Sequence, residues 1–485
     1  MGELQGVNMR KNIIRFCFFS ATVISFFYVI YNVYCFKYGD GIYSLKKFYE
    51  LEKNQVDVLV LGSSHAYEDI NPAVLWDEHG IAAYDLCGSI QPLWNTYYYL
   101  KEALKTQTPR LIILEAYTTT FADEYSNDSR IIKNTYGLKP SFDKIKAIGT
   151  SSPVERQKEF LLEFTQYHTR YKELTMADFV KGQGNNLYKD WKGFGCNMET
   201  VGFAKPDVCG ITEVGEMSEK TEEYYVKVLR LANENGIPVL VIVSPYADIT
   251  IADQCIYNRA AVIAEEEGAL FYNFNSDYDE IGLDFTTDMA DGSHLNYIGN
   301  QKFTRYLGKF LDGNYDDLLI DRRGDAAYAS WERNSEYFQQ QLYNQRVKNC
   351  TSGIELIKLL HNDNYISVVS MKGVNLSKEI WEEGLSLSEI EDDHLENSVW
   401  ILESNRIMER LKPADKEYYH MELSAFSDLV VRLGGNAEGR NQIIYNRLDY
   451  SKAPNGVNIF IYDKKTGSVV DSVWLDIENN LGCVR

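Results

Sequence analysis

The chain has 485 residues, of which 45% are hydrophobic and 25% are charged. This composition is typical of globular protein and excludes a chain that is disordered throughout, and the length predicts about three structural units. Acidic residues outnumber basic ones by 70 to 49, for a net charge of -21, which argues against a nucleic-acid-binding protein because such proteins need a basic face to meet phosphates.

The first predicted element is an apolar segment near the N-terminus. Residues 16–36, FCFFSATVISFFYVIYNVYCF, contain no charged side chain, and about 20 such residues cross a bilayer as a helix. A cleaved signal peptide is the alternative, but its shorter apolar core ends at a small-residue cleavage site, which is not evident here. Because Arg10, Lys11 and Arg15 precede the segment closely, we expect residues 1–39 to form a cytoplasmic stub and a single-pass anchor, with the bulk of the chain outside the cytoplasm.

Strands and helices alternate after the anchor. The apolar runs VDVLVLG, IAAYDLCG and RLIILEAY predict three buried strands at 56–62, 81–88 and 110–117. Proline-initiated helices are predicted between them, at 72–80 and 92–107. A segment at about 118–217 follows, which is rich in Gly, Asn and aromatic residues and is expected to be a long irregular insertion.

The alternation then resumes. Two further strands are predicted at 237–245 and 269–274, with helices at 218–236, 253–268 and 296–311. Strands that alternate with helices indicate an α/β layered domain with a mostly parallel sheet, here of five strands, over residues 50–315. Ligands of such domains bind beyond the carboxyl ends of the strands.

The last third of the chain has a different pattern. Residues 321–349 are polar and helix-compatible and are expected to form a helical connector. Beyond it, residues 350–485 alternate in the manner of antiparallel strands, with a hairpin that turns at Lys464 to Gly467. We therefore expect a separate β-rich accessory module at the C-terminus.

The candidate chemistry lies at the ends of the first and last strands. A serine hydroxyl attacks a carbonyl only when a base takes its proton and a third group orients that base. Ser64 follows the first strand in LGSSH, and Asp291 precedes His294 by three residues in the loop after the fifth strand. Because both loops belong to one edge of one sheet, the three residues predict a Ser-His-Asp catalytic triad.

These motifs resemble those of the SGNH (GDSL-like) hydrolase superfamily. GSSH at 62–65 stands where that family has Gly-Asp-Ser, with Ser63 in place of the aspartate, and DGSH at 291–294 matches its terminal Asp-x-x-His. The resemblance covers about residues 55–312. It implies a three-layer α/β fold and a triad formed by the same serine, aspartate and histidine.

The resemblance also implies an oxyanion hole. LCGSIQP stands where the family has a glycine whose N–H binds the oxyanion, so Gly88 and the N–H of Ser64 are the implied donors. The family's Gly-x-Asn-Asp block is absent after the third strand, where the sequence reads LIILEAYTTT. Gln91 and Asn95 are candidates to replace its asparagine or to contact substrate, and the alternative is that both cap the start of a helix.

An outward-facing SGNH domain on a membrane anchor resembles the branch that decorates cell-envelope polymers. This branch includes DltD of teichoic-acid D-alanylation and the alginate O-acetylation proteins. The resemblance implies a bacterial cell-membrane enzyme that takes an acyl group, with acetyl favoured, from a multi-spanning membrane O-acyltransferase and passes it through Ser64 to an envelope glycan. The implied partners are that glycan, that acyltransferase and the bilayer around residues 16–36; no cofactor is expected.

Two other functions remain open. The first is an SGNH esterase or deacetylase of the same envelope glycans, in which water replaces the sugar hydroxyl as the acceptor. The second is a non-catalytic scaffold that binds the polymer or a membrane O-acyltransferase, in which Ser64 would be inert. The C-terminal segment GVNIFIYDKKTGSVVDSVWLDI is similar to the core of the interleukin-like EMT-inducer domain, which implies a binding or spacing module without a catalytic role.

Aromatic residues and the neighbouring histidine are further candidates for substrate contacts. His65 directly follows the predicted nucleophile and either touches substrate or packs beside the turn. Trp191, with Tyr188 and Phe194, either lines a sugar groove or belongs to a packed insertion.

Cysteine usage leaves the redox state open. Cys196 and Cys209 lie 13 residues apart in a Gly-rich stretch, so they either form a disulfide in an extracytoplasmic domain or remain two free thiols. The sequence has no CxxC pair, and no metal site is expected.

Overall fold

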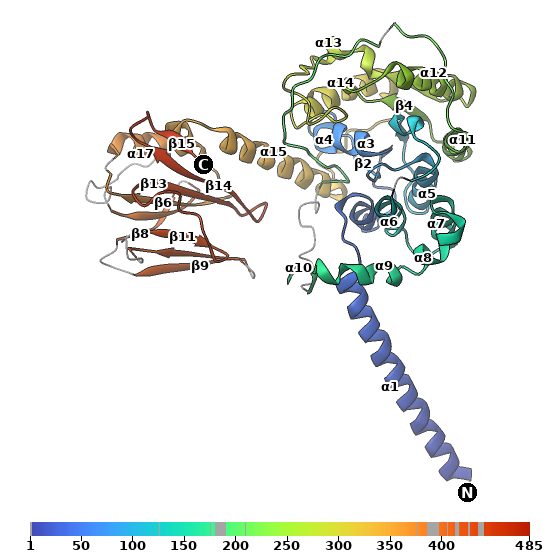
Figure 1. The fold of residues 1–485 in the computed structure, drawn as a ribbon, viewed down its shortest axis with the longest axis horizontal. Coiled ribbons are helices and arrows are strands. Elements are labelled where there is room, and N and C mark those ends of the chain that lie inside the picture. The colour runs from blue at the N-terminus through green and yellow to red at the C-terminus, as the bar shows by residue number, and fades with distance from the viewer. Residues whose placement is uncertain are drawn as a thin grey trace. The chain divides into compact units, whose positions relative to one another are not determined.

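Two units divide the chain in the computed structural model, Met1–Ser335 and Glu336–Arg485 (Figure 1). Each unit has its own hydrophobic core and is described by itself. The structure describes residues 2–125, 127–174, 176–179, 191–208, 210–374, 376–385, 397–404, 406–412, 417–424, 427–434 and 441–485.

A five-stranded parallel sheet forms the centre of the first unit, in the order β2-β1-β3-β4-β5. Its strands are β1 (Val58–Leu61), β2 (Ala83–Asp85), β3 (Leu111–Glu115), β4 (Val239–Val243) and β5 (Leu270–Asn273). The chain passes from β1 to β2 on one side and returns to β3 on the other, so the strand order reverses between β1 and β3. A switch point of this kind opens a crevice at the carboxyl ends of the strands.

Continuous apolar runs form these strands because both faces of the sheet are covered. Leu59 and Leu61 point into one core, and Val58 and Val60 point into the other. The helices on the first face are α5 (Leu93–Ala103), α11 (Glu219–Glu234) and α12 (Ile251–Glu266). Those on the second face are α3 (Ser64–Asp69), α4 (Pro72–His79), α13 (Tyr278–Ile281) and α14 (Gly299–Tyr315). The predicted α/β architecture with a five-stranded parallel sheet is confirmed.

The segment expected to be irregular contains short helices, so that expectation is wrong for much of it. Asn127 and Ser141 accept hydrogen bonds from the first turns of the two longest helices. Helices this short are marginal in isolation, and here tertiary packing stabilises them around Phe160 and Tyr167. The helices are α6 (Asp128–Thr135), α7 (Phe142–Ser151), α8 (Gln157–Leu161), α9 (Phe164–Tyr167), η4 (His168–Lys172) and α10 (Met176–Phe179).

One long helix precedes this domain. Helix α1 (Gly2–Tyr34) contains a stretch, Asn12–Tyr34, that is long and apolar enough to cross a membrane. The single predicted apolar helix at the N-terminus is therefore present, and it starts earlier than residue 16 because the polar N-terminal residues continue the same helix.

The second unit is an antiparallel β structure. A six-stranded sheet, ordered β15-β14-β13-β6-β7-β8, and a four-stranded sheet, ordered β12-β11-β10-β9, share an apolar core. A second core lies on the six-stranded sheet. The part of α15 (Ala329–Asn349) that belongs to this unit contributes to it, as do α16 (Gly353–Leu359) and α17 (Lys378–Leu385). The strands are β6 (Tyr365–Lys372), β7 (Val399–Glu403), β8 (Arg406–Leu411), β9 (Tyr418–Ser424), β10 (Ser427–Arg432), β11 (Gln442–Tyr445), β12 (Leu448–Asp449), β13 (Gly456–Asp463), β14 (Ser468–Asp476) and β15 (Gly482–Val484).

Candidate active site

A tight turn places Ser64 at the carboxyl edge of the sheet. Strand β1 ends at Leu61, and Ser64 is the first residue of α3. Between them, Gly62 has φ +156°, and a Cβ at this position would lie 2.9 Å from both Ala66 Cβ and Glu115 Cβ. Only glycine fits this close approach. The N–H of Ser64 lies in the first turn of α3, where helices leave donors free for a ligand.

A compact loop presents His294 toward this turn. Asp291 Oδ1 accepts hydrogen bonds from the backbone N–H of Ser293 at 2.8 Å and of His294 at 3.0 Å. The carbonyl of Gly292 accepts from the N–H groups of Ala247 and Asp248 after β4. A Cβ on Gly292 would lie 1.7 Å from a carboxylate oxygen of Asp248, so glycine permits this contact.

The serine, histidine and aspartate form one hydrogen-bonded chain. His294 Nε2 lies 2.8 Å from Ser64 Oγ, and His294 Nδ1 lies 2.9 and 3.0 Å from the two oxygens of Asp291. A carboxylate accepts from Nδ1–H, which leaves Nε2 to accept the proton of the serine hydroxyl. The Ser64 residue is 8% exposed, while the Asp291 side chain is 53% exposed. The sequence-predicted triad residues are therefore in contact, and the hydroxyl lies in a largely enclosed place.

The surroundings of Asp291 stabilise its ionised form. Burial raises the pKa of this carboxyl, but the hydrogen bonds from Ser293 N and from His294 outweigh burial and hold the pKa below its usual value. Asp291 is therefore ionised at neutral pH and available to stabilise an imidazolium at His294.

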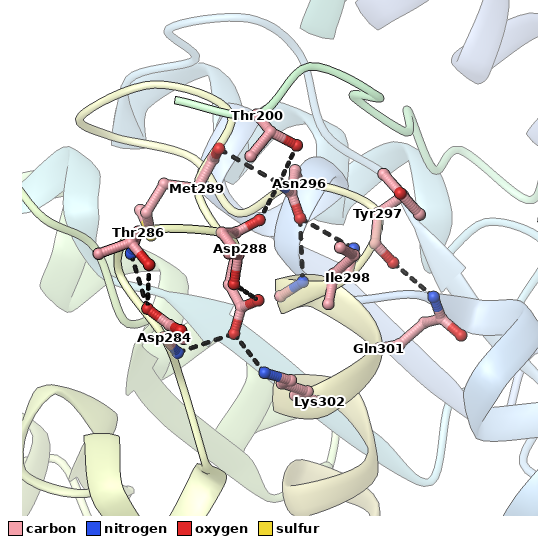
Figure 2. A network of polar contacts seen from close by, with 12 residues as sticks. Thr200, Asp284, Thr286, Asp288, Met289, Asn296, Tyr297, Ile298, Gln301 and Lys302 are labelled. Carbon is pink, nitrogen blue, oxygen red and sulfur yellow. Dashed lines mark hydrogen bonds and ion pairs between the residues drawn. The ribbon is translucent and has the colours of Figure 1, made fainter. Parts of the chain in front are cut away.

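A polar network fixes the two ends of the histidine loop (Figure 2). The side-chain amide of Asn296 donates to the carbonyls of Thr287 and Met289, and its oxygen accepts from the N–H groups of Ile298 and Gly299 at the start of α14. The network continues through the fully buried Asp288, which accepts from Lys302 Nζ at 2.6 Å and from Asp284 N at 2.8 Å.

Asp69 joins the nucleophile's helix to the histidine loop. Asp69 is the last residue of α3, and its Oδ1 accepts from Leu295 N at 2.9 Å. Burial raises the pKa of this carboxyl well above its usual value. The sequence gives no local signal for this positioning residue, because its contact spans 226 positions and belongs to no local motif.

The turn that carries Gly88 is held by hydrogen bonds from Gln91 and from Asn134 of α6. Gln91 N donates to the carbonyl of Gly88 at 3.1 Å, and Asn134 Nδ2 donates to the carbonyl of Ser89 at 3.0 Å. A Cβ on Gly88 would lie 2.2 Å from Asn134 Oδ1. Ile90 has φ +47° and lines the cavity beside Ser64. Left-handed backbone at a β-branched residue is strained, and the bonds from Gln91 and Asn134 hold it.

Gln91 and Asn95 make internal contacts. Both are fully buried, and neither is among the described residues that line the cavity. Gln91 Nε2 donates to Thr96 Oγ1, while Asn95 Oδ1 accepts from Tyr125 OH and Ser151 Oγ. Neither side chain caps the start of α5. The Asn95 amide donates to the carbonyl of Asn134 in the last turn of α6, and its oxygen holds Tyr125 in the cavity wall.

A cavity of about 450 Å³ opens in front of Ser64 and His294. Aromatic side chains form part of its wall, and Glu124 and Arg130 add charged groups of opposite sign. A cavity of this size, lined by both apolar and polar side chains, suits a small organic ligand. The aromatic lining residues are Trp94, Tyr117, Phe121 and Tyr125.

His65 lines the same cavity as a neutral ring. It stacks on Tyr117 with centroids 3.5 Å apart and lies edge-on to Tyr246. Burial, with the nearby His294 as a smaller cause, lowers the pKa of His65 well below its usual value. Because neither ring nitrogen has a hydrogen-bond partner among the described residues, its contacts are those of packing.

Trp191 is part of a packed region. It is 8% exposed and its ring centroid lies 5.5 Å from that of Phe194. Among the described residues it does not line the cavity beside Ser64. Tyr188 and Cys209 lie outside the described residues, so the groove and disulfide expectations that involve them stay predictions. No cluster of three or more potential metal ligands occurs in the described ranges.

Glu115 is a buried acid at the end of β3 that should make stability depend on pH. Burial raises its pKa to about 8, although Tyr117 N and Ser244 N donate to it. The folded protein therefore keeps a proton that the unfolded chain releases above its ordinary pKa of about 4.3. Stability should fall as pH rises from about 4.5 to 8, by at most about 1.4 kcal/mol per pH unit.

The matched variant for this prediction is Glu115→Gln, which mimics the protonated acid. Chemical denaturation of both full-length proteins in detergent, from pH 5 to 8, isolates the contribution of Glu115. The unfolding free energy of Glu115→Gln minus that of the parent protein should increase steadily as pH rises. Parallel curves would show that Glu115 titrates normally in the folded state.

Two comparisons with known proteins found no match. No protein-family model matches the sequence, and no curated protein matches it. The geometry of the site is therefore the basis for inferring a function.

Proposed function

We propose that the chain is a membrane-anchored serine O-acyltransferase of the SGNH type. It acylates a hydroxyl of a bacterial cell-envelope polysaccharide through an acyl-Ser64 intermediate, and acetyl is the favoured acyl group. The observation that carries the proposal is the continuous chain from Ser64 Oγ through His294 to Asp291. Its position beside a cavity at the strand-order reversal supports a reactive site rather than a chance contact.

In the first half-reaction, the acyl group is transferred from the donor to Ser64. His294 Nε2 takes the proton from Ser64 Oγ as the oxygen attacks the acyl carbonyl, and Asp291 stabilises the imidazolium that forms. The N–H of Ser64 is one donor for the oxyanion, and Gly88 is the second that the SGNH resemblance implies. His294 then gives the proton to the leaving group, and the acyl ester on Ser64 remains.

In the second half-reaction, the acyl group is transferred from Ser64 to the sugar. A sugar hydroxyl gives its proton to His294 Nε2 as its oxygen attacks the acyl carbonyl. Collapse of the intermediate breaks the bond to Ser64 Oγ, which regains the proton. The esterase alternative uses water in this step and otherwise needs the same groups.

The other parts of the chain fit an envelope protein. The span Asn12–Tyr34 would anchor it in the cell membrane, with the domain on the extracytoplasmic side by the positive-inside rule. A multi-spanning membrane O-acyltransferase would supply the acyl group. The antiparallel second unit would serve as a binding or spacing module.

The test is labelling of the full-length protein in detergent with a fluorophosphonate probe. We expect one adduct by intact mass, on the peptide that contains Ser64, and its loss in His294→Ala because the base is gone. An acyl donor with and without envelope oligosaccharides then separates transfer from hydrolysis. Folded protein that stays unlabelled, both in detergent and in native membranes, would contradict the proposal and favour the scaffold function.

A further inference from the structure

Short helices beside the end of α1 expose large apolar side chains to solvent. Leu162 is 62% exposed, Phe164 52%, Tyr171 60% and Phe179 61%. We call the segment that carries them, residues 157–174 and 176–179, the juxtamembrane helices; it comprises α8, α9, η4 and α10. Several large apolar side chains exposed within one short segment are uncommon on a soluble domain and indicate an interaction surface.

A buried arginine ties these helices to the point where α1 ends. Arg170 Nη1 donates to the carbonyls of Val33 at 3.4 Å and Tyr34 at 3.3 Å, and also to that of Cys35. Unpaired carbonyls end every helix, and here Arg170 satisfies the last two of α1, those of Val33 and Tyr34. Figure 1 shows α9 and α10 on either side of this end of α1.

An ion-pair cluster attaches α10 at the same place. Asp178 Oδ1 lies 2.9 Å from Arg170 Nη2 and 2.8 Å from Lys37 Nζ, so its charge is balanced by two cations. Because Lys37 follows α1 by three residues, α10 is joined directly to the segment that leaves the helix. Phe179, next to Asp178, remains exposed.

Aromatic residues connect α9 to the last turns of α1. Tyr31 lies edge-on to Tyr167, and both hydroxyls lie within hydrogen-bond distance of Glu163 Oε2. Glu163 also pairs with Lys144 of α7. Tyrosine near the end of an apolar helix is typical of the membrane–water interface, so the attachment point lies at interfacial depth if α1 spans the bilayer.

We infer that the juxtamembrane helices lie in the headgroup layer of the phospholipid bilayer that α1 crosses, with Leu162, Phe164 and Phe179 inserted among the lipids. The inference rests on the proposed membrane anchoring of α1. Interfacial helices bury their apolar face about 5–10 Å into the boundary of headgroups and acyl chains. Three of the four acids in this segment, Glu159, Glu163 and Asp178, are paired with cations, which lowers the cost of that position. The fourth, Glu173, is exposed.

The surface has a direct connection to the candidate active site. Phe160 of α8 and Tyr167 of α9 pack in one apolar cluster with Ile131 and Ile132 of α6, and Tyr125 packs against this cluster. Tyr125 and Arg130 line the cavity beside Ser64. Contact with the bilayer would therefore position the cavity wall as well as the domain. An acyl donor delivered from the membrane would then reach a cavity whose entrance has a fixed position.

Photo-crosslinking of the full-length protein in phospholipid nanodiscs and in native membranes tests the inference. The photoreactive residue p-benzoylphenylalanine is placed singly at Phe164 or Phe179. Phe26 of α1, 61% exposed, is the positive control for anchoring. Ile251, 65% exposed at the start of α12, is the matched apolar control away from α1. Mass spectrometry of the irradiated protein distinguishes a lipid adduct from a protein adduct.

The expected result is a mass increase of one phospholipid at Phe164, Phe179 and Phe26, with none at Ile251. Lipid adducts at Phe26 without any at Phe164 and Phe179 would overturn the inference and leave the anchor intact. Protein adducts alone at these two positions in native membranes would overturn it in favour of a protein partner. Absence of lipid adducts at Phe26 would overturn the anchoring as well, whereas the triad proposal would stand on its separate labelling test.

Discussion

Replacing Ser64 by alanine should lower the turnover of an activated ester, such as p-nitrophenyl acetate, by roughly 10⁴–10⁶-fold. The variant has no oxygen at the end of the hydrogen-bonded chain, so no acyl-enzyme can form. The residue is small and 8% exposed at the first position of α3, so the fold should survive the change. The measurement is steady-state kcat and kcat/KM of the full-length protein, with circular dichroism to verify folding.

The neighbouring serine provides a matched control. Ser63 is fully buried, and its hydroxyl has no hydrogen-bond partner among the described residues. Ser63→Ala removes the same group one position earlier in the chain, so its turnover should stay within a few-fold of the parent. Equal loss in Ser63→Ala and Ser64→Ala would point to a general disturbance of the turn. Unchanged turnover in Ser64→Ala would show that Ser64 is not the nucleophile.

Asp291→Asn should lower kcat by roughly 10⁴-fold, which is the second largest effect that we expect. The asparagine oxygen still accepts from the N–H groups of Ser293 and His294, so the loop keeps its shape. The amide has no charge to stabilise the imidazolium. When its N–H₂ group faces Nδ1, it favours the tautomer that carries the proton on Nε2, which cannot take the proton from Ser64.

Asp284→Asn is the control for this change. Asp284 is another acid of the same region, and its Oδ1 accepts from the N–H and hydroxyl of Thr286 without touching His294. Its replacement should leave kcat nearly unchanged. A loss in Asp291→Asn that is no larger than in Asp284→Asn would contradict the assigned role of Asp291. Fluorophosphonate labelling rates of the two variants give an independent measure of how reactive Ser64 remains.

The sequence by itself determined the strands, the apolar helix and the catalytic candidates. Apolar runs such as VLVL and VLVIV can be buried on both faces only inside a layered structure, so their order with amphipathic helices predicted the parallel sheet. Glycine at position 62 marked the sharp turn after β1. The Asp-x-x-His spacing predicted the Asp291–His294 contact because it is local, closing within four residues.

Only the tertiary structure decided what surrounds these residues. Ser64 and His294 are 230 positions apart in the sequence. Whether they meet depends on the order of the strands in the sheet, which local sequence patterns do not reveal. Asp69 and Asn134 position the site through hydrogen bonds to backbone groups that are far away in the sequence, and no local motif predicts these bonds. The short helices of the insertion escaped prediction because packing against α1 and α6, rather than intrinsic helix propensity, stabilises them. Local periodicity therefore determined the elements, and the long-range packing of the chain decided which side chains meet.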